Sequence, residues 1–268
     1  MNSLRMRNKG KTMRGILALG MLTATACSVK ELRGDCPCYL QVTFAGTETG
    51  GEARLLGWRE ASALFRETVR IEEGTPWVHP VEKGFLTVAA CKGVRESVLE
   101  THRVGIPAGR EADSLYAGFA EVDATGETAR AEIALRKQFA TVFLDIRKKA
   151  AELKDYAFRV EGNTSGFDLL DHSPVPGLFR CEPRARDGES IVTFRLPRQT
   201  DDSLTVTIRS GNGVPATFPL GKYIAALGYS WKTEELQDIY VAIDLVNSQV
   251  DLRVADWEEG MVFPLVEI

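Results

Sequence analysis

The chain has 268 residues, 26% of them charged and 44% hydrophobic, and its formal net charge at pH 7 is -4. This composition is ordinary for a globular protein, and the length suffices for one large domain or two modest ones. The acidic balance and the lack of a basic stripe argue against a nucleic-acid partner, so none is expected.

The N-terminus has the pattern of an export signal. Five basic residues and no acidic one precede an apolar stretch from Gly15 to Ala26. This stretch is too short to span a bilayer, so residues 1–26 are predicted to be a signal peptide. The small residues directly before Cys27 predict cleavage by a lipoprotein signal peptidase and attachment of lipid to the Cys27 thiol. The alternative is an ordinary secretory peptide cut near Ala26, which would leave Cys27 as a free or paired thiol.

Four further cysteines follow, at Cys36, Cys38, Cys91 and Cys181. In an exported chain an even number of cysteines indicates disulfides, and four cysteines allow three connectivities. Cys36 and Cys38 can pair with each other only through a strained ring, so we expect two longer-range bridges, or one bridge with free thiols. A Cys-x-Cys metal site is the other interpretation. The chain lacks a second Cys or His pair at ligand spacing, so no metal is predicted.

Alternation of apolar and polar residues dominates the mature chain and is typical of β-strands. Strands are predicted, in chain order, at 39–44, 85–91, 133–135, 142–146, 156–160, 192–196, 204–208, 239–245, 250–254 and 261–268. Only 58–66 and 147–153 are predicted to be short helices. Turn residues separate the strands, as at 49–51, 123–126 and 210–213, and no internal repeat is visible in the sequence.

Many short strands separated by turns predict an all-β fold of two tandem β-sandwiches. The expected division is a signal peptide at 1–26, a lipidated spacer at 27–35, an N-terminal β-sandwich at 36–137 and a C-terminal β-sandwich at 138–268. No Pro- or Ser-rich linker separates the halves, so the two sandwiches are expected to pack closely. The apolar terminal strand must complete its own sheet or present an open edge.

No motif in the sequence predicts an active site. The three histidines, His79, His102 and His172, are scattered and form no pair at ligand spacing. The chain lacks a nucleophile elbow, a P-loop and a dinucleotide-binding glycine motif. The acidic pairs Asp201–Asp202 and Glu258–Glu259 are predicted to be solvated loop charges rather than the carboxylates of a glycosidase. We therefore expect no catalytic residue and no cofactor, and the protein is predicted not to be an enzyme.

The sequence around the predicted lipidation site resembles a known family. From Cys27 to Leu40 it reads CSVKELRGDCPCYL, which joins a cysteine for lipidation, a short charged spacer and Asp-Cys-Pro directly before the first strand. This arrangement is similar to the fimbrillin-associated anchor lipoproteins of Bacteroidetes. The segment 135–142 resembles the start of that family's second domain, and the order of motifs from 218 to 257 resembles its end. The second cysteine, Cys38, departs from the family pattern.

The resemblance implies two transthyretin-like β-sandwiches and a structural role in the outer membrane, where lipid on Cys27 would hold the protein at the base of a type V-like fimbria. The implied partner is a fimbrillin shaft subunit, bound by strand complementation or edge pairing. In this mode an unpaired strand edge gains backbone hydrogen bonds, and apolar pockets receive alternate side chains. Shaft subunits of such fimbriae lose an N-terminal strand to an Arg-specific protease, whereas an anchor keeps it and thereby limits the growth of the fimbria.

Two alternatives remain open. A fimbrial shaft or tip subunit is the first, because an Arg-specific protease could cut at Arg33 and release the strand at 39–44. A surface glycan-binding lipoprotein is the second, and it would require an exposed platform of aromatic side chains. The tryptophans lie far apart in the sequence and form no visible stripe: Trp58, Trp77, Trp231 and Trp257.

Overall fold

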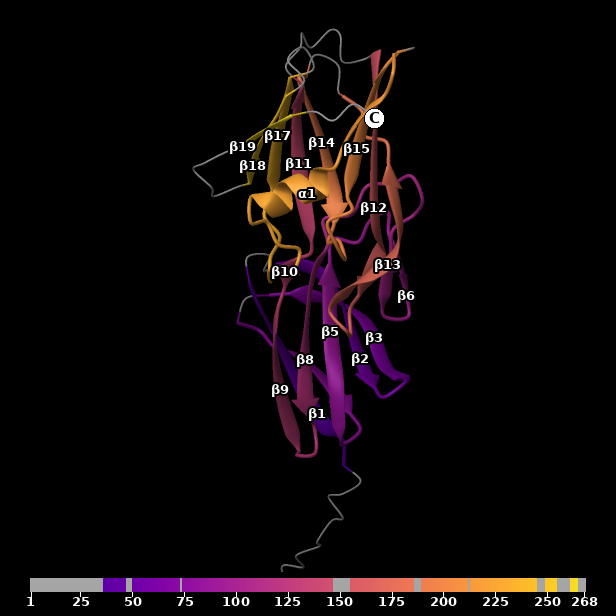
Figure 1. The fold of residues 1–268 in the computed structure, drawn as a ribbon. Coiled ribbons are helices and arrows are strands. Elements are labelled where there is room, and N and C mark those ends of the chain that lie inside the picture. The colour runs from indigo at the N-terminus through magenta and orange to yellow at the C-terminus, as the bar shows by residue number, and fades with distance from the viewer. Residues whose placement is uncertain are drawn as a thin grey trace, which may run out of the picture. The chain divides into compact units, whose positions relative to one another are not determined.

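The computed structural model describes residues 36–46, 50–72, 74–146, 155–185, 189–211, 213–244, 249–254 and 261–264 (Figure 1). For the last two ranges it describes the backbone alone. The predicted signal peptide, Cys27 and its spacer, the helix predicted at 147–153, Trp257 and Glu258–Glu259 lie outside the described residues.

The first sandwich consists of two sheets that share an apolar core. The smaller sheet has the strand order β4-β1-β9, formed by β1 (Cys38–Ala45), β4 (Trp77–Val81) and β9 (Thr128–Ala134). The larger sheet has the order β10-β8-β5-β2-β3, formed by β2 (Gly51–Arg59), β3 (Ser62–Ile71), β5 (Phe85–Lys92), β8 (Tyr116–Asp123) and β10 (Arg136–Lys137). Because side chains alternate along a strand, every second residue points inward, and Leu40, Leu55, Val88 and Ile133 are buried together.

The second sandwich has its own core. One sheet has the order β14-β11-β17-β18-β19, formed by β11 (Phe139–Ile146), β14 (Ile191–Pro197), β17 (Ile239–Asp244), β18 (Gln249–Val254) and β19 (Met261–Pro264). The other sheet has the order β16-β15-β12-β7-β6, and β13 pairs with β12. Its strands are β6 (Val98–Glu100), β7 (Arg103–Gly105), β12 (Tyr156–Asp168), β13 (Ser173–Cys181), β15 (Thr205–Ser210) and β16 (Ala216–Phe218). A short helix, α1 (Leu220–Ala226), follows β16 and buries Leu220 and Ile224. No helix among the described residues is long and apolar enough to cross a membrane.

The two sandwiches have the same strand pairing. The first strand of each pairs antiparallel with the fourth and parallel with a late strand: β1 with β4 and β9, and β11 with β14 and β17. The second strand pairs with the third and the fifth, as β2 does with β3 and β5, and β12 with β13 and β15. The fifth strand then pairs with the next, β5 with β8 and β15 with β16. The fold is therefore a duplicated all-β sandwich, as the alternation predicts, although the sequence shows no repeat.

Each strand predicted from alternation coincides with or overlaps a strand of the structure. The helix predicted at 58–66 is wrong, because these residues form the end of β2, a tight turn and the start of β3. Glu60 turns the chain with a φ of 51°. The ring of Phe65 lies so close over Gly57 that a Cβ there would be 2.1 Å from it. Packing between strands therefore overrides the local helical preference of this segment.

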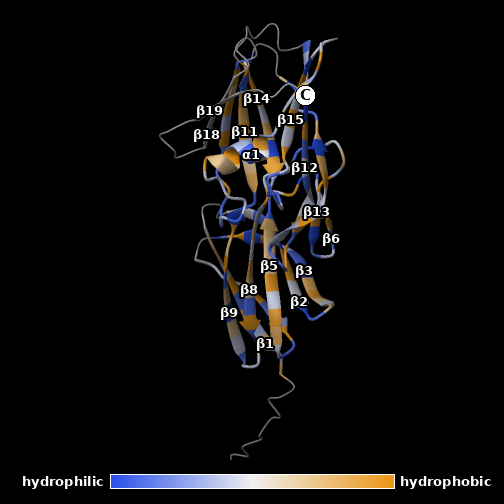
Figure 2. Ribbon diagram, in the orientation of Figure 1, coloured by the Kyte–Doolittle hydropathy of each residue, from blue (hydrophilic) through white to orange (hydrophobic). Residues whose placement is uncertain are grey.

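One hairpin from the first half of the chain joins a sheet of the second half. β6 and β7 precede residue 137, yet β7 pairs with β12 around Val104↔Phe167. Val104 and Phe167 pack with Leu56 and Ala89 of the first sandwich in one apolar cluster. The central strand β5 consequently has buried residues on both faces, and most of it is coloured as hydrophobic in Figure 2. The boundary between 137 and 138 stays our proposed division of the chain, and strand pairing crosses it at this hairpin.

Candidate functional site at the N-terminal strand

The first strand after the predicted spacer lies in the middle of its sheet. β1 pairs antiparallel with β4 over five residue pairs and parallel with β9 over seven. The N–H of Tyr39 donates to the carbonyl of Glu127, and the N–H of Leu135 donates to the carbonyl of Ala45, both at 2.9 Å. β1 therefore uses both of its backbone edges inside the molecule.

The inward side chains of β1 belong to the core of the first sandwich. Cys38, Leu40 and Val42 have no exposed surface, whereas Tyr39 is 52% exposed. Withdrawing β1 would return Leu40 and Val42 to water, at about 1.5–3 kcal/mol each, and would leave the facing edges of β4 and β9 unpaired. The strand is thus a structural part of the sandwich and fills the groove that its removal would open.

The segment between the two sandwiches is held by buried polar contacts. The N–H of Gln138 donates to the carbonyl of Leu115 at 2.9 Å, and the carbonyl of Gln138 accepts from the N–H of Arg198 at 3.2 Å. The guanidinium of Arg198 donates to the side-chain oxygen of Gln138 at 2.9 Å, and to the carbonyls of Trp231, Thr233 and Glu234. All these acceptors are neutral oxygens, and burial lowers the pKa of Arg198. Arg198 therefore acts as a buried cross-link that joins β14 to the segment between the sandwiches and to the 231–234 loop.

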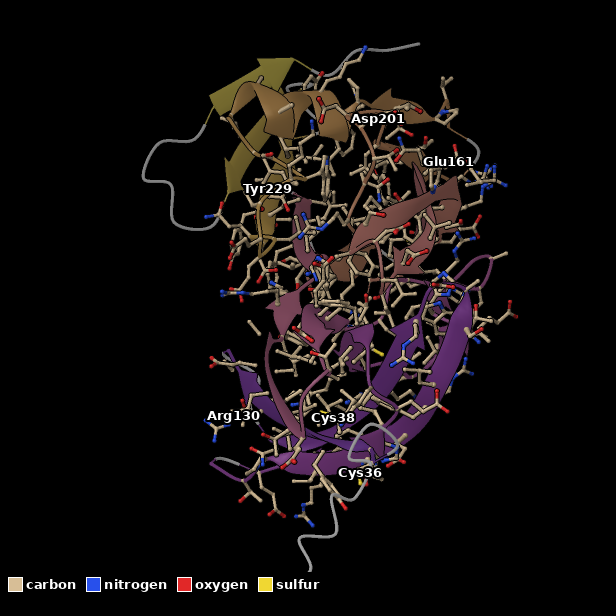
Figure 3. The ribbon with its side chains drawn as sticks, turned by 90° about the horizontal axis from the view of Figure 1, so that it is seen from below. Cys36, Cys38, Arg130, Glu161, Asp201 and Tyr229 are labelled. Atoms are coloured by element: carbon tan, nitrogen blue, oxygen red, sulfur yellow. The ribbon has the colours of Figure 1, made fainter. Side chains whose placement is uncertain are left out.

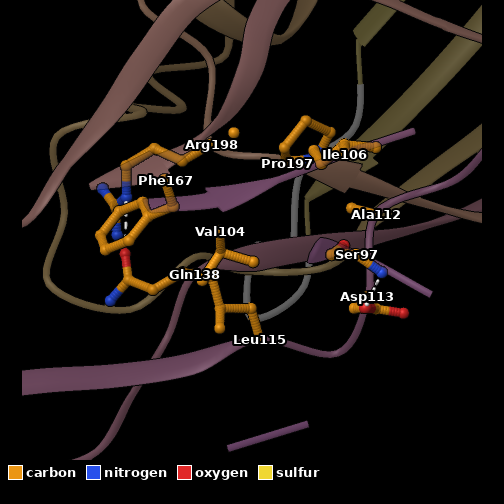
Figure 4. A pocket seen from close by; sticks show the side chains of 11 residues that line it. Ser97, Val104, Ile106, Ala112, Asp113, Leu115, Gln138, Phe167, Pro197 and Arg198 are labelled. Carbon is orange, nitrogen blue, oxygen red and sulfur yellow. Dashed lines mark hydrogen bonds between the residues drawn. The ribbon is translucent and has the colours of Figure 1, made fainter. Parts of the chain in front are cut away.

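A small pocket lies beside this junction (Figure 4). Its walls are mostly apolar and include Val104, Ile106, Ala112, Leu115 and Phe167. The carboxylate of Asp113 accepts hydrogen bonds from the N–H groups of Arg95, Glu96 and Ser97 at 2.8–3.2 Å. Burial alone would raise the pKa of Asp113, but these donors outweigh it and hold the pKa below its ordinary value. Because the polar groups of Asp113 and Arg198 are already bonded within the protein, we interpret the pocket as loose packing rather than a ligand site.

The four described cysteines are free thiols. Cys36 is exposed and Cys38 is buried (Figure 3), and so are Cys91 and Cys181. Each buried cysteine belongs to a different apolar cluster. Burial raises the pKa of the Cys91 and Cys181 thiols to about 12, which makes both inert at neutral pH. The structure therefore contains none of the predicted bridges among these four residues.

The histidines and acidic residues are dispersed. Each histidine has partners of its own: His79 with Glu67 and Trp77, His102 with Asp168 and Trp58, and His172 with Ala117 and Phe167. Asp201 lies in an exposed turn, where its carboxylate accepts the N–H of Ser203 at 2.7 Å. Within the described ranges, no three His, Cys, Asp or Glu side chains gather as metal ligands would.

The described tryptophans do not share a surface. Trp58 meets the ring of His102 edge-on at 5.1 Å, Trp77 stacks on His79 at 5.0 Å, and Trp231 is buried against Tyr229. Each of these rings is packed in a separate environment. This arrangement gives little support to a tryptophan platform for sugar stacking.

The sequence gives no signal for Arg198 or Asp113. Arg198 follows a predicted strand, and Asp113 lies in a segment without alternation. The burial of both depends on contacts with residues far away in the chain, namely Gln138 for Arg198 and the loop at 95–97 for Asp113.

No protein-family model matches the sequence, and no curated protein matches it. Among solved structures, the chain is similar to the fimbrial anchor protein Mfa2 from Porphyromonas gingivalis, with a TM-score of 0.60, 11% identity and coverage of 86% of this chain and 100% of that chain. A Bacteroides thetaiotaomicron protein provisionally described as polysaccharide-binding gives a TM-score of 0.60 at 15% identity, covering 86% of this chain and 99% of that chain. A second protein of that organism, provisionally described as an adhesin, gives 0.59 at 13% identity, with coverage of 86% and 99%. At these identities the comparisons establish a shared fold, and the fold that the resemblance implies is confirmed.

Proposed function

We propose that this protein is a structural lipoprotein of the outer membrane that anchors the base of a fimbria and limits its growth. The observation that carries the proposal is β1, seated between β4 and β9 with its inward side chains buried. A sandwich that keeps this strand has no open groove at that position for a strand of the next subunit. The shared fold with a fimbrial anchor protein supports the same assignment.

In this proposal Cys27 ties the protein to the membrane. Each methylene buried in the bilayer contributes about 0.8 kcal/mol, so more than one acyl chain on Cys27 gives stable attachment. The spacer at 27–35 reaches at most about 3.3 Å per residue, which keeps the first sandwich within some tens of ångströms of the lipid. Load from a fimbria would then reach the lipid through the first sandwich and the spacer.

The alternatives have weaker support. A shaft or tip subunit would have to give up β1, and with it the burial of Leu40 and Val42. A glycan-binding lipoprotein has the support of one similar structure. The described tryptophans are packed against other rings and do not offer a shared stacking surface. We propose no enzymatic activity, cofactor or nucleic-acid partner.

Replacement of Cys27 tests the proposal. In the producing bacterium, Cys27→Ser should move the protein out of the membrane fraction and release fimbriae into the medium. Cys36→Ser is the matched control, because Cys36 is an exposed thiol close to Cys27 in the sequence, and this variant should retain both protein and fimbriae on the cell. If Cys27→Ser leaves the fimbriae attached, the anchoring role is contradicted.

A further inference from the structure

The matching topology of the two sandwiches exposes one difference between them. β9 and β17 are equivalent, since each is the parallel neighbour of the first strand of its sandwich. After β17 the chain turns back, and β18 pairs antiparallel with it over six residue pairs, from Ile239↔Val254 to Asp244↔Gln249. After β9 the chain continues through Leu135 into β10 and β11. Among the described strands, β9 pairs with β1 alone and ends its sheet.

The free edge of β9 presents backbone groups of alternate residues. The bonds of Glu127 and Leu135 to β1 flank the ladder and fix which residues face that strand. In a parallel ladder, alternate residues of a strand direct both N–H and C=O to the same neighbour. Odd-numbered residues of β9 therefore bond to β1, whereas Thr128, Arg130 and Glu132 direct their backbone groups to the open side.

The side chains of these three residues are exposed, while Ala129, Ala131 and Ile133 are buried in the core. Arg130 lies at the outside of the sandwich in Figure 3. Arg130 and Glu132 have no ion-pair partner among the described residues. The edge thus combines unpaired backbone with one positive and one negative side chain on the same face.

A surface groove runs beside the far end of β9. It is lined by Glu132 and Ala134 of β9, by Phe119 of β8, and by His172 and Lys232 of the second half of the chain. Phe119 is 41% exposed there. The carbonyl of Ala134 packs against Gly118, where a Cβ would lie 2.1 Å from the oxygen, so β8 closes the edge at this end. The open stretch is therefore Thr128 to Glu132, and an extended peptide on it would reach the exposed ring of Phe119.

We propose that the edge of β9 binds one antiparallel strand of the fimbrial shaft subunit that adjoins this protein. This inference rests on the proposed function and names the surface through which it operates. The molecule itself supplies the precedent, because the equivalent edge of β17 carries the antiparallel strand β18. The bound segment should be extended, with an acidic side chain opposite Arg130 and a basic one opposite Glu132.

A second copy of this chain is a less suitable donor. In a second copy, β18 is already paired with β17. Donating β18 to the edge of β9 would therefore break the six residue pairs between β17 and β18. A strand from a separate polypeptide can bind without breaking these residue pairs. Binding at β9 also leaves β1 in place, so the edge can receive a partner without reopening the groove that β1 fills.

Proline at Arg130 tests the edge directly. Arg130→Pro removes the outward N–H and leaves the bonds between β9 and β1 intact, because proline is tolerated at strand edges. Arg130→Thr is the matched control, since it removes the same charge and keeps the N–H. Both full-length, lipidated variants are produced in the native bacterium, and the shaft subunit that co-purifies with each after detergent extraction is compared with subunit from sheared fimbriae. Arg130→Pro should reduce co-purification by about tenfold or more, whereas Arg130→Thr should stay within about threefold of the unmodified protein.

A photo-crosslinking amino acid provides a second measurement that does not depend on how Arg130→Pro folds. At Glu132 it should cross-link to the shaft subunit, and at Val78, which is 51% exposed on the opposite edge strand β4, it should not. If the unmodified protein binds the shaft subunit but neither Arg130→Pro nor the position of the cross-linker changes the result, the edge inference fails and the anchoring role stands. If the unmodified protein binds no shaft subunit, the proposed function fails and the edge inference fails with it.

Discussion

The guanidinium of Arg198 donates to the side-chain oxygen of Gln138 at 2.9 Å, and this buried bond ties the end of β14 to the segment that enters the second sandwich. Gln138 in turn donates its N–H to Leu115, in the segment just before β8 of the first sandwich. The two residues therefore form a continuous polar link across the predicted boundary. Such a link holds the two sandwiches in one arrangement, because sandwiches joined only by a flexible segment would swing independently.

Replacing Arg198 with Met should lower the free energy of unfolding by about 3 kcal/mol, because several buried carbonyls lose their charged donor. Arg159→Met is the control, since Arg159 is 51% exposed and forms a surface ion pair with Glu182 at 3.2 Å. That variant should change stability by less than about 1 kcal/mol. Urea unfolding measures both, and an equally small loss for Arg198→Met would show that the junction does not depend on the guanidinium.

Asp113 should make the protein sensitive to acid. Its folded pKa is held below the unfolded value near 3.9, so its stabilising contribution is complete above that pH and is lost as the pH falls through the folded pKa. Asp113→Asn should lower stability at neutral pH by about 1.5–3 kcal/mol and flatten the acid limb of the stability curve. Asp202→Asn, at an exposed carboxylate in a turn, is the control. Parallel acid limbs for Asp113→Asn and the unmodified protein would contradict this role.

His172 should add a second, milder pH dependence. Its ring lies between Phe119 and Phe167, and burial lowers its pKa, so the folded protein favours the neutral ring. This contribution is present above the unfolded pKa near 6.5 and is lost as the pH falls through the folded pKa. His172→Asn suits the φ of 49° at this position, which asparagine tolerates. Thermal unfolding from about pH 8 to pH 5 should vary less in this variant, and an unchanged slope would assign the pH dependence to other groups.

Thiol titration decides between the structure and the predicted disulfides. In the native protein only Cys36 should react rapidly with a thiol reagent, because the other three described cysteines are buried. After denaturation without reductant, Cys38, Cys91 and Cys181 should react as well. A deficit of two thiols under those conditions would show that one of the bridges predicted from the sequence forms in the cell.

The alternation of apolar and polar residues predicts much of the fold, because burial of one face of a strand produces this alternation directly. The strand predicted at 39–44 lies within β1 for this reason, and the strand predicted at 239–245 coincides with β17 over Ile239–Asp244. The segment 58–66 is misread because its helical preference is local, whereas the turn at Glu60 and the contact of Phe65 with Gly57 depend on tertiary packing. The hairpin of β6 and β7 escapes prediction because its strands are short and pair far along the chain.

The candidate site is only partly predictable. Burial of Leu40 and Val42 follows from their spacing, but the position of β1 between β4 and β9 requires the topology. The free edge of β9 cannot be predicted from the sequence. Among the described strands, β17 is followed and covered by β18, whereas none pairs with the outer edge of β9. Lipidation of Cys27 is predicted from the sequence alone, and this residue lies outside the described residues.

The central claim is that β1 stays in the mature protein behind a lipidated Cys27. Intact-mass and N-terminal peptide analysis of the native protein, extracted from outer membranes, tests it most directly. We predict a chain that begins at Cys27, carries acyl chains on that residue and contains Cys38–Ala45. A mature chain that begins at Gly34 after cleavage at Arg33, without lipid, would contradict an anchor and indicate a shaft or tip subunit.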